Sequence, residues 1–230
     1  MINNTSKPLV FVGSNLNIYK VYELVENIGI TIAGIIDDDY HGQGNYNGIP
    51  IIARESDIDH IRNQYQFLCV TNWIPGTDPV VLRNNQKRQR IIDLLDSLNV
   101  EQATIISKLA QVSAKATIGK GVIIDAFAMV EPNVIVGDHT TIYAYSVIGH
   151  DSIIGYNNVI QRYCLITSSV NIQNNVYFGL CSRASRSKVT ISSGTFLHPN
   201  LTLLRGTKFN EEISLVGKDL RKVYQNVEIE

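Results

Sequence analysis

The sequence is poor in the features that mark several common classes of protein. It has only three cysteines in 230 residues, too few for a disulfide framework and without metal-ligand spacing, which suits a reducing compartment. It contains no uncharged apolar run of 18 residues, and no signal peptide follows the first methionine. Its 20 basic and 21 acidic side chains nearly cancel, which removes the electrostatic argument for binding nucleic acid or an acidic membrane. We therefore expect a cytoplasmic protein with no nucleic-acid partner and no membrane span.

The two halves of the chain differ in charge density. Residues 1–103 carry 8 basic and 12 acidic side chains, whereas residues 104–204 carry 7 and 4. Since charged residues make up about a quarter of an average globular chain, the second half is too sparse for an ordinary helical surface. Residues 205–230 carry five charges of each sign. We expect two domains, 1–103 and 104–204, followed by a polar tail.

The first half alternates between apolar runs and amphipathic segments. A short apolar run ends at Gly13, and another ends at the acidic triplet that begins with Asp37. A loop rich in Gly and Asn over residues 42–48 leads to an apolar segment at 49–52. This order of strand, Gly turn, helix and strand predicts a small, open, parallel α/β sheet of the Rossmann type. The expected strands are 8–12, 30–36 and 67–71, and the expected helices are 15–28 and 84–98.

The second half repeats every six residues. Thirteen positions in succession, six residues apart, hold a bulky apolar side chain. They are Ile106, Val112, Ile118, Ile124, Val130, Val136, Ile142, Ile148, Ile154, Ile160, Ile166, Ile172 and Phe178. A small or β-branched residue follows most of them four places later, with Asn158 as the exception, and the phase slips by one after Ala184. A period of six fits neither a helix nor a flat strand, but it fits a solenoid with one short strand and one corner per hexad.

Three hexads per turn give a prism with coils of 18 residues. Residue n then lies beneath residue n+18 at the usual strand spacing of about 4.8 Å. The repeated Ile and Val side chains fill the interior. A prism with such thin walls buries little surface by itself, so we expect it to pack against copies of itself.

Three stretches give the chain a more specific resemblance. They are Val12-Gly13-Ser14-Asn15, the strand end Gly34-Ile35-Ile36-Asp37-Asp38, and Ile148-Gly149-His150-Asp151-Ser152-Ile153-Ile154-Gly155. With the hexads, they resemble the sialic acid O-acetyltransferase NeuD family of left-handed β-helix acyltransferases, which includes N-acetyltransferases of nucleotide-linked amino sugars. The resemblance covers residues 8–204. It implies a left-handed parallel β-helix in the second half, homotrimers, acetyl-CoA bound between neighbouring prisms, and a histidine acting as general base.

His150 is the candidate base. Histidine titrates near neutrality, and a well-placed general base contributes a factor of about 10²–10⁴ in rate. His150 is expected near a corner with its ring outward, oriented by Asp151 or Tyr143. The family often has Glu directly before this His and a second His nine residues later, where this chain has Gly149 and Val159.

The resemblance also implies residues for the cosubstrate. Ser168 lies one coil above His150, where relatives often have Gly, and Gly179 matches a glycine of the family. Both are expected to line the path of the acetyl-CoA thioester arm, and ordinary corner geometry explains them equally well. Arg186 lies at the phase slip and is a candidate for the CoA phosphates.

The first domain is expected to hold the nucleotide part of the sugar substrate. A Gly turn before a helix holds pyrophosphate through backbone N–H groups, so Gly13, Ser14 and Asn15 are candidate contacts. Asp37 and Asp38 end a strand at the carboxyl edge, where open α/β sheets bind ligands. Their carboxylates are expected to accept hydrogen bonds from a base N–H or from ribose hydroxyls.

The leading hypothesis is an acetyl-CoA-dependent N-acetyltransferase of a nucleotide-linked amino sugar destined for surface polysaccharide. Two alternatives stay open. One is O-acetylation of a free sugar such as a sialic acid, and the other is a trimeric, non-catalytic partner of a sugar-synthesis enzyme. No metal is expected, because the five histidines lack the spacing of a shared zinc site.

Overall fold

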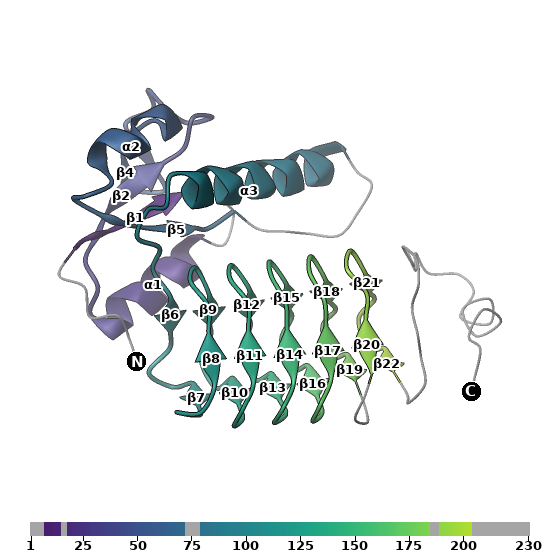
Figure 1. Cartoon of the computed structure of the whole chain (residues 1–230). Helices are drawn as coiled ribbons and strands as arrows, with labels where there is room; N and C mark the ends of the chain where they lie inside the picture. The colour runs from purple at the N-terminus through teal and green to yellow at the C-terminus, as the bar shows by residue number, and fades with distance from the viewer. Residues whose placement is uncertain (1–6, 15–17, 72–78, 185–188, 204–230) are drawn as a thin grey trace. The chain divides into compact units, whose positions relative to one another are not determined.

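The computed structural model describes residues 7–14, 18–71, 79–184 and 189–203 (Figure 1). The chain divides into two compact units, residues 1–108 and 109–230. The domain limits drawn from composition stay predictions, and the predicted tail lies outside the described residues. A search of the described helices finds none that combines the length and the apolar character needed to cross a membrane.

The first unit is built on a sheet with the strand order β3-β4-β2-β1-β5. Strand β1 pairs in parallel with β2 and β5, and β2 pairs in parallel with β4. Strand β1, which lies between β2 and β5, is buried along its whole length, as expected for a parallel strand with both faces of the sheet covered. The strands are β1 (Leu9–Val12), β2 (Ile32–Ile36), β3 (Asn45–Tyr46), β4 (Ile49–Ala53) and β5 (Gln66–Cys69).

One edge of this sheet departs from the predicted parallel arrangement. The expected loop 42–48 contains strand β3, which runs antiparallel to β4, so the sheet is mixed. Asn47 and Gly48 join the two strands, with φ of 52° and 76°. An Asn-Gly pair favours the tight turn with two positive φ angles that a two-residue hairpin needs. The prediction missed this signal because it read the segment by composition alone.

The first unit has two longer helices, one between β1 and β2 and one after β5. They are α1 (Ile18–Ile28) and α3 (Pro79–Ser97), and the short η1 (Glu55–Asp57) and α2 (Ile58–Ile61) follow β4. Helix α1 buries Leu24 and Val25, while α3 buries Ile91, Ile92 and Leu95. These side chains recur at helical spacing, so each helix has one apolar side that the core covers.

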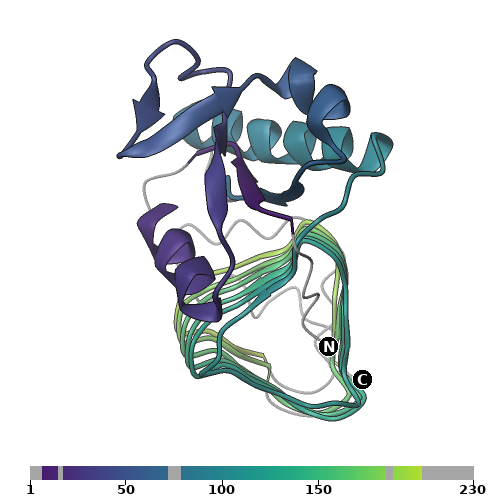
Figure 2. The same ribbon diagram turned by 90° about the vertical axis from the view of Figure 1, so that its left-hand side faces the viewer.

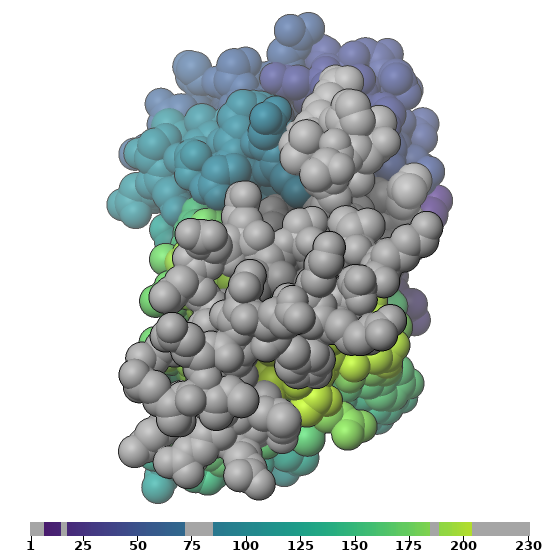
Figure 3. All heavy atoms as spheres, turned by 90° about the vertical axis from the view of Figure 1, so that its right-hand side faces the viewer, coloured from purple at the N-terminus to yellow at the C-terminus, as the bar shows by residue number. Residues whose placement is uncertain are grey.

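The parallel β-helix begins at β6 (Ile105–Ile106), just before the limit of the second unit at residue 109, and continues through that unit. Its two-residue strands stack into three sheets of six, five and six strands, and a view along the stack shows a triangular outline (Figure 2). The last coil, with β20, β21 and β22, is at the end that faces the viewer in Figure 3. The strands are β6 (Ile105–Ile106), β7 (Gln111–Val112), β8 (Thr117–Ile118), β9 (Ile123–Ile124), β10 (Met129–Val130), β11 (Ile135–Val136), β12 (Thr141–Ile142), β13 (Val147–Ile148), β14 (Ile153–Ile154), β15 (Val159–Ile160), β16 (Leu165–Ile166), β17 (Asn171–Ile172), β18 (Tyr177–Phe178), β19 (Arg183–Ala184), β20 (Thr190–Ile191), β21 (Phe196–Leu197) and β22 (Thr202–Leu203).

The strand register confirms the predicted 18-residue coil. Val130 pairs with Ile148, and Ile148 pairs with Ile166, each 18 positions apart. After β19 the spacing becomes 19, as between Ile172 and Ile191, which confirms the slip of one residue. The hexad side chains from Ile124 to Phe178 are all buried, so they form the interior as predicted.

Ten successive corners of the β-helix contain a non-glycine residue in the left-handed conformation. The non-glycine residues with φ between 51° and 62° recur every six positions from 127 to 181. Such a residue turns the chain sharply, which lets two-residue strands follow one another around a triangle. They are Phe127, Asn133, His139, Tyr145, Asp151, Asn157, Tyr163, Ser169, Asn175 and Cys181.

Buried hydroxyl groups join one coil to the next. The Ser146 hydroxyl donates to the Gln161 carbonyl and accepts from the Cys164 N–H. Thr140, Ser152 and Ser182 make the same pair of bonds. Asn158, the exception in the predicted pattern, follows the same rule, because its amide spans the coils and satisfies two backbone groups.

Candidate functional site

The sequence-predicted base lies at a corner of the β-helix. His150 is in the turn between β13 and β14, and its side chain is 54% exposed. Its ring Nδ1 lies 2.7 Å from Oδ2 of Asp151, which is the predicted orienter. Tyr143, the other nominee, instead lies beneath the guanidinium of Arg162. The expectation of an outward ring at a corner is therefore confirmed.

The hydrogen bond to Asp151 determines which ring nitrogen is free. An ionised carboxylate only accepts hydrogen bonds, so Nδ1 carries the proton and, in the neutral ring, Nε2 keeps its lone pair. The hydrogen bond with His150, followed by one from Asn133, lowers the pKa of Asp151 below its usual value. Asp151 therefore stays ionised near neutral pH, which keeps it an acceptor for the proton on Nδ1 of His150.

Two supporting residues come from the coil below and were missed from sequence. Asn133 Nδ2 donates to Oδ1 of Asp151 at 2.9 Å, and Oε2 of Glu131 accepts from the His150 N–H at 2.8 Å. Asn133 precedes Asp151 by 18 residues. Stepping back by one coil from Asp151 would have found Asn133, whereas Glu131 precedes His150 by 19 positions and lies just outside that rule.

The missing Glu before His150 has a steric reason. A Cβ at Gly149 would lie 2.7 Å from the backbone N of Ser168 and the carbonyl C of Thr167 in the next coil. Because this distance is shorter than any normal contact, the position accepts only glycine without a shift of the backbone. Val159, in place of the second His, is a buried strand residue with an apolar side chain, so it donates no hydrogen bond from its side chain.

Of the residues predicted to contact acetyl-CoA, Ser168 lies near His150 and Gly179 does not. Ser168 lies in the coil next to His150, and the N–H of Ser169 bonds to the His150 carbonyl. Gly179 lies at a different corner, and a Cβ there would be 2.3 Å from the Leu197 carbonyl oxygen. The close packing of the next coil is thus enough to explain why residue 179 is glycine. The contacts of Ser168 and Gly179 with acetyl-CoA stay predictions. Arg186 lies outside the described residues.

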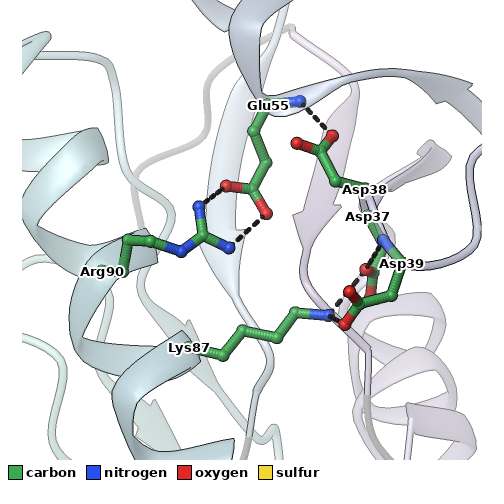
Figure 4. Close-up of polar contacts among 6 residues, drawn as sticks. All are labelled: Asp37, Asp38, Asp39, Glu55, Lys87 and Arg90. Carbon is green, nitrogen blue, oxygen red and sulfur yellow. Dashed lines mark hydrogen bonds and ion pairs between the residues drawn. The ribbon is translucent and has the colours of Figure 1, made fainter. Parts of the chain in front are cut away.

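A second polar cluster lies at the carboxyl edge of the first unit's sheet (Figure 4). Asp37, directly after β2, has no solvent exposure, and its Oδ1 accepts from the Lys87 ammonium at 2.6 Å. Lys87 also bonds to Asp39 at 2.8 Å. Burial works to lower the pKa of Lys87, but the hydrogen bonds to the two carboxylates outweigh it and raise that pKa. The other oxygen of Asp37, Oδ2, is buried and has no hydrogen-bond partner within the described part of the chain.

Asp38 has a different role from its neighbour. It is exposed, and its Oδ1 accepts from the Glu55 N–H at the start of η1. Glu55 is buried and binds both guanidinium nitrogens of Arg90 on α3. Figure 4 shows Lys87 and Arg90 reaching from one side of α3 toward these carboxylates. Their spacing of three along the predicted charged helix was a signal that the sequence analysis did not use.

In the Gly turn after β1, the backbone N–H of Gly13 is used by the sheet itself. The N–H of Gly13 bonds to the Ile36 carbonyl at 2.8 Å, so it is not free to hold a phosphate. A Cβ at Gly13 would lie 2.0 Å from the Thr71 hydroxyl, which explains the glycine. Ser14 hydrogen-bonds to Tyr46, and Asn15 lies outside the described residues. The rings of Tyr46 and Tyr40 meet edge to face, with centroids 4.7 Å apart.

The described residues hold no group of three or more His, Cys, Asp or Glu side chains close enough to bind a metal ion. His139 is buried and packs edge-on against Tyr156. His198 packs beside Phe196. These two histidines therefore have packing roles in the β-helix.

Known proteins resemble this chain both in the six-residue repeats and in the fold. Residues 115–150 match the family model "Bacterial transferase hexapeptide (six repeats)". The perosamine N-acetyltransferase PerB from Caulobacter crescentus, solved in complex with CoA and GDP-perosamine, is 20% identical, with a TM-score of 0.74 over 87% of this chain and 90% of that one. WeeI from Acinetobacter baumannii is 17% identical, with a TM-score of 0.68 over 86% and 94% of the two chains. At these identities the likeness establishes the fold. It confirms the prediction of a small α/β sheet followed along the chain by a left-handed β-helix.

One curated protein also aligns with part of the sequence. The uncharacterized protein L142 of Acanthamoeba polyphaga mimivirus is 35% identical over 102 residues, which is 44% of this chain. The match spans only 18% of the length of that viral protein. It therefore adds a sequence relative but no activity.

Proposed function

We propose that this protein is an acetyl-CoA-dependent N-acetyltransferase that acts on the amino group of a nucleotide-linked amino sugar. The observation that carries the proposal is the hydrogen bond between His150 Nδ1 and Asp151, which leaves Nε2 free at an exposed corner. The fold shared with a sugar N-acetyltransferase that was solved with CoA and GDP-perosamine supports the same chemistry. The finer resemblance to the NeuD family is part of this proposal.

In the proposed reaction the sugar amine attacks the carbonyl carbon of the acetyl-CoA thioester. His150 Nε2 removes the proton of the attacking nitrogen as the new C–N bond forms, and Asp151 stabilises the resulting imidazolium. The C–S bond then breaks, and the leaving CoA thiolate takes the proton from the His150 imidazolium, which returns the base to its neutral form. Since Val159 offers no donor, the developing oxyanion would be held by backbone N–H groups.

The first unit would bind the nucleotide part of the substrate. The support is the buried Oδ2 of Asp37, which has no hydrogen-bond partner among the described residues although such an atom normally accepts a hydrogen bond. Because Asp37 has no solvent exposure, a base N–H or a ribose hydroxyl would satisfy this oxygen once the groups that cover it move aside. Tyr40 and Tyr46 offer aromatic surface beside Ser14 and Asp37, so a planar base is the fitting ligand. Asp38 remains a second candidate acceptor, and Gly13 contributes by its shape rather than by its N–H.

We also propose a homotrimer in the cytoplasm. The two β-helix faces that meet at the His150 corner expose apolar side chains, which favours burial against other copies. They are Met129 (36% exposed) and Leu165 (38%) on one face, and Ile135 (46%) and Ile153 (47%) on the other. Acetyl-CoA would lie between two prisms, with Ser168, Gly179 and Arg186 as candidate contacts. The three unpaired cysteines suit a reducing compartment.

The test is mass spectrometry of the purified protein incubated with acetyl-CoA and a panel of nucleotide-linked amino sugars. Wild type should add one acetyl group to at least one member, and His150→Ala should lower the rate by about 10²–10⁴. His60→Ala, a change at an exposed histidine in α2, is the control and should act as wild type. Equal rates for His150→Ala and wild type would remove His150 from the chemistry.

Two further measurements separate the alternatives. Calorimetry that finds no affinity for any nucleotide diphosphate would favour O-acetylation of a free sugar such as a sialic acid. The apolar Val159 favours a non-catalytic partner of a sugar-synthesis enzyme, because it leaves the site without a side-chain donor. Tight acetyl-CoA binding together with turnover would exclude that last alternative.

A further inference from the structure

The His150 site extends into the coil below through a chain of hydrogen bonds. Asn133 Nδ2 donates to Oδ1 of Asp151 at 2.9 Å, and Oδ2 of the same carboxylate lies 2.7 Å from His150 Nδ1. The two oxygens of Asp151 are thus each committed to one partner. Asn133 is exposed and Asp151 is 50% exposed, so neither side chain is held in place by burial.

We propose that Asn133 is a positioning residue for the His150 base and acts through Asp151. This inference rests on the proposed function and deepens it. By occupying Oδ1, the amide prevents the half-exposed carboxylate from rotating, and Oδ2 stays directed at Nδ1. His150 then keeps the tautomer in which Nε2 carries the lone pair.

The backbone explains how two surface side chains meet so directly. Asn133 and Asp151 are both in the left-handed conformation, with φ of 62° and 58°. They occupy equivalent corner positions 18 residues apart, so their side chains leave neighbouring coils in the same direction. Asn and Asp tolerate this conformation better than other residues with a side chain, which allows functional groups here at low backbone cost. Glu131 adds a second restraint by accepting the His150 N–H.

A matched control lies at another corner of the same β-helix. Asn157 Nδ2 donates to Oδ1 of Asn175 at 2.9 Å, and both residues are left-handed and 18 apart. That bond has the same donor–acceptor distance as the bond from Asn133 but contacts neither His150 nor Asp151, and its donor Asn157 is buried whereas Asn133 is exposed. Any general effect of losing an inter-coil amide bond should therefore appear in both places.

The experiment compares Asn133→Gly with Asn175→Gly, since glycine removes the amide and still accepts positive φ. Asn133→Gly should lower kcat about five- to tenfold, the net value of one ordinary solvent-exposed hydrogen bond, without changing KM for acetyl-CoA. Asn175→Gly should leave kcat unchanged. Asn133→Asp keeps the shape but places an acceptor against an acceptor, so its kcat should fall at least as far. In an Asp151→Ala background, Asn133→Gly should have no further effect.

A readout that needs no turnover separates this inference from the proposed function. Nitrogen NMR of His150 reports which ring nitrogen is protonated, and Asn133→Gly should change a single tautomer into a mixture, whereas Asn175→Gly should not. If wild type acetylates no sugar but the tautomer responds, the positioning role stands and the proposed function fails. If wild type is active and Asn133→Gly matches it in both kcat and tautomer, Asn133 has no positioning role.

Discussion

The ion pair between Asp37 and Lys87 gives the sharpest prediction about the first unit. Asp37 has no exposed side-chain area, and Lys87 retains 12% of its own. Replacing Lys87 with Met leaves a buried carboxylate whose remaining hydrogen bond to Oδ1 comes from the Asp39 N–H. Removing one partner of a buried pair costs about 3–5 kcal/mol, because the other charge stays uncompensated. We therefore expect Lys87→Met to lose about that much of the free energy of unfolding of this unit.

The assay is hydrogen exchange at increasing urea, followed by mass spectrometry on peptides that cover β2. With about 1–3 kcal/mol per molar urea for a small unit, the midpoint should fall by more than about 1 M. Lys7→Met is the control, because it removes an ion pair to Glu101 whose partners are 36% and 30% exposed. Such a pair contributes only about 0–1 kcal/mol.

A second variant identifies the cause. Asp37→Asn combined with Lys87→Met removes both charges and should recover most of the loss, since no buried charge remains. If Lys87→Met costs no more than Lys7→Met, the carboxylate is not held by this pair. If the double variant is as unstable as Lys87→Met, packing of the lysine rather than its charge is responsible.

The other predictions concern titration and the β-helix. The pKa of Lys87 in the folded protein lies above its ordinary 10.5, so its contribution to stability should be complete below pH 10.5 and be lost as the pH rises through the folded value. Urea unfolding at a series of alkaline pH values should therefore show a step in the free energy of unfolding that Lys87→Met lacks. Asn158→Val should cost about 1–3 kcal/mol and lower Tm, because the buried N–H of Val176 loses its acceptor, and an unchanged Tm would refute this account. Gly149→Ala should lower stability by about 1–3 kcal/mol through its contact with the next coil, which thermal unfolding against wild type would measure. Burial raises the pKa of Cys164 to about 12, so iodoacetamide at pH 8 should label this thiol only after denaturation, and labelling of the native protein would contradict the buried position.

The β-helix could be predicted almost completely from the sequence because its rule is local. Every sixth side chain must fill the same narrow interior, so the hexads from Ile106 to Phe178 reveal both the strands and the coil length. The slip after Ala184 was equally visible. The α/β sheet was predicted less completely, since the hairpin of β3 depends on the short turn at Asn47 and Gly48 and not on a long apolar run.

The residues of the candidate site also fall into two groups, those that the sequence indicated and those that only the structure revealed. By itself the sequence determined His150, its neighbour Asp151 and the acidic end of β2, because adjacent residues and a known resemblance point to them. Only the tertiary structure decided which groups support them: Asn133 and Glu131 from the coil below, and Lys87 and Arg90 from α3. The physical reason is that a hydrogen bond or an ion pair depends on distance in space, and coil stacking and helix packing join residues that are 18 to 50 positions apart in the chain.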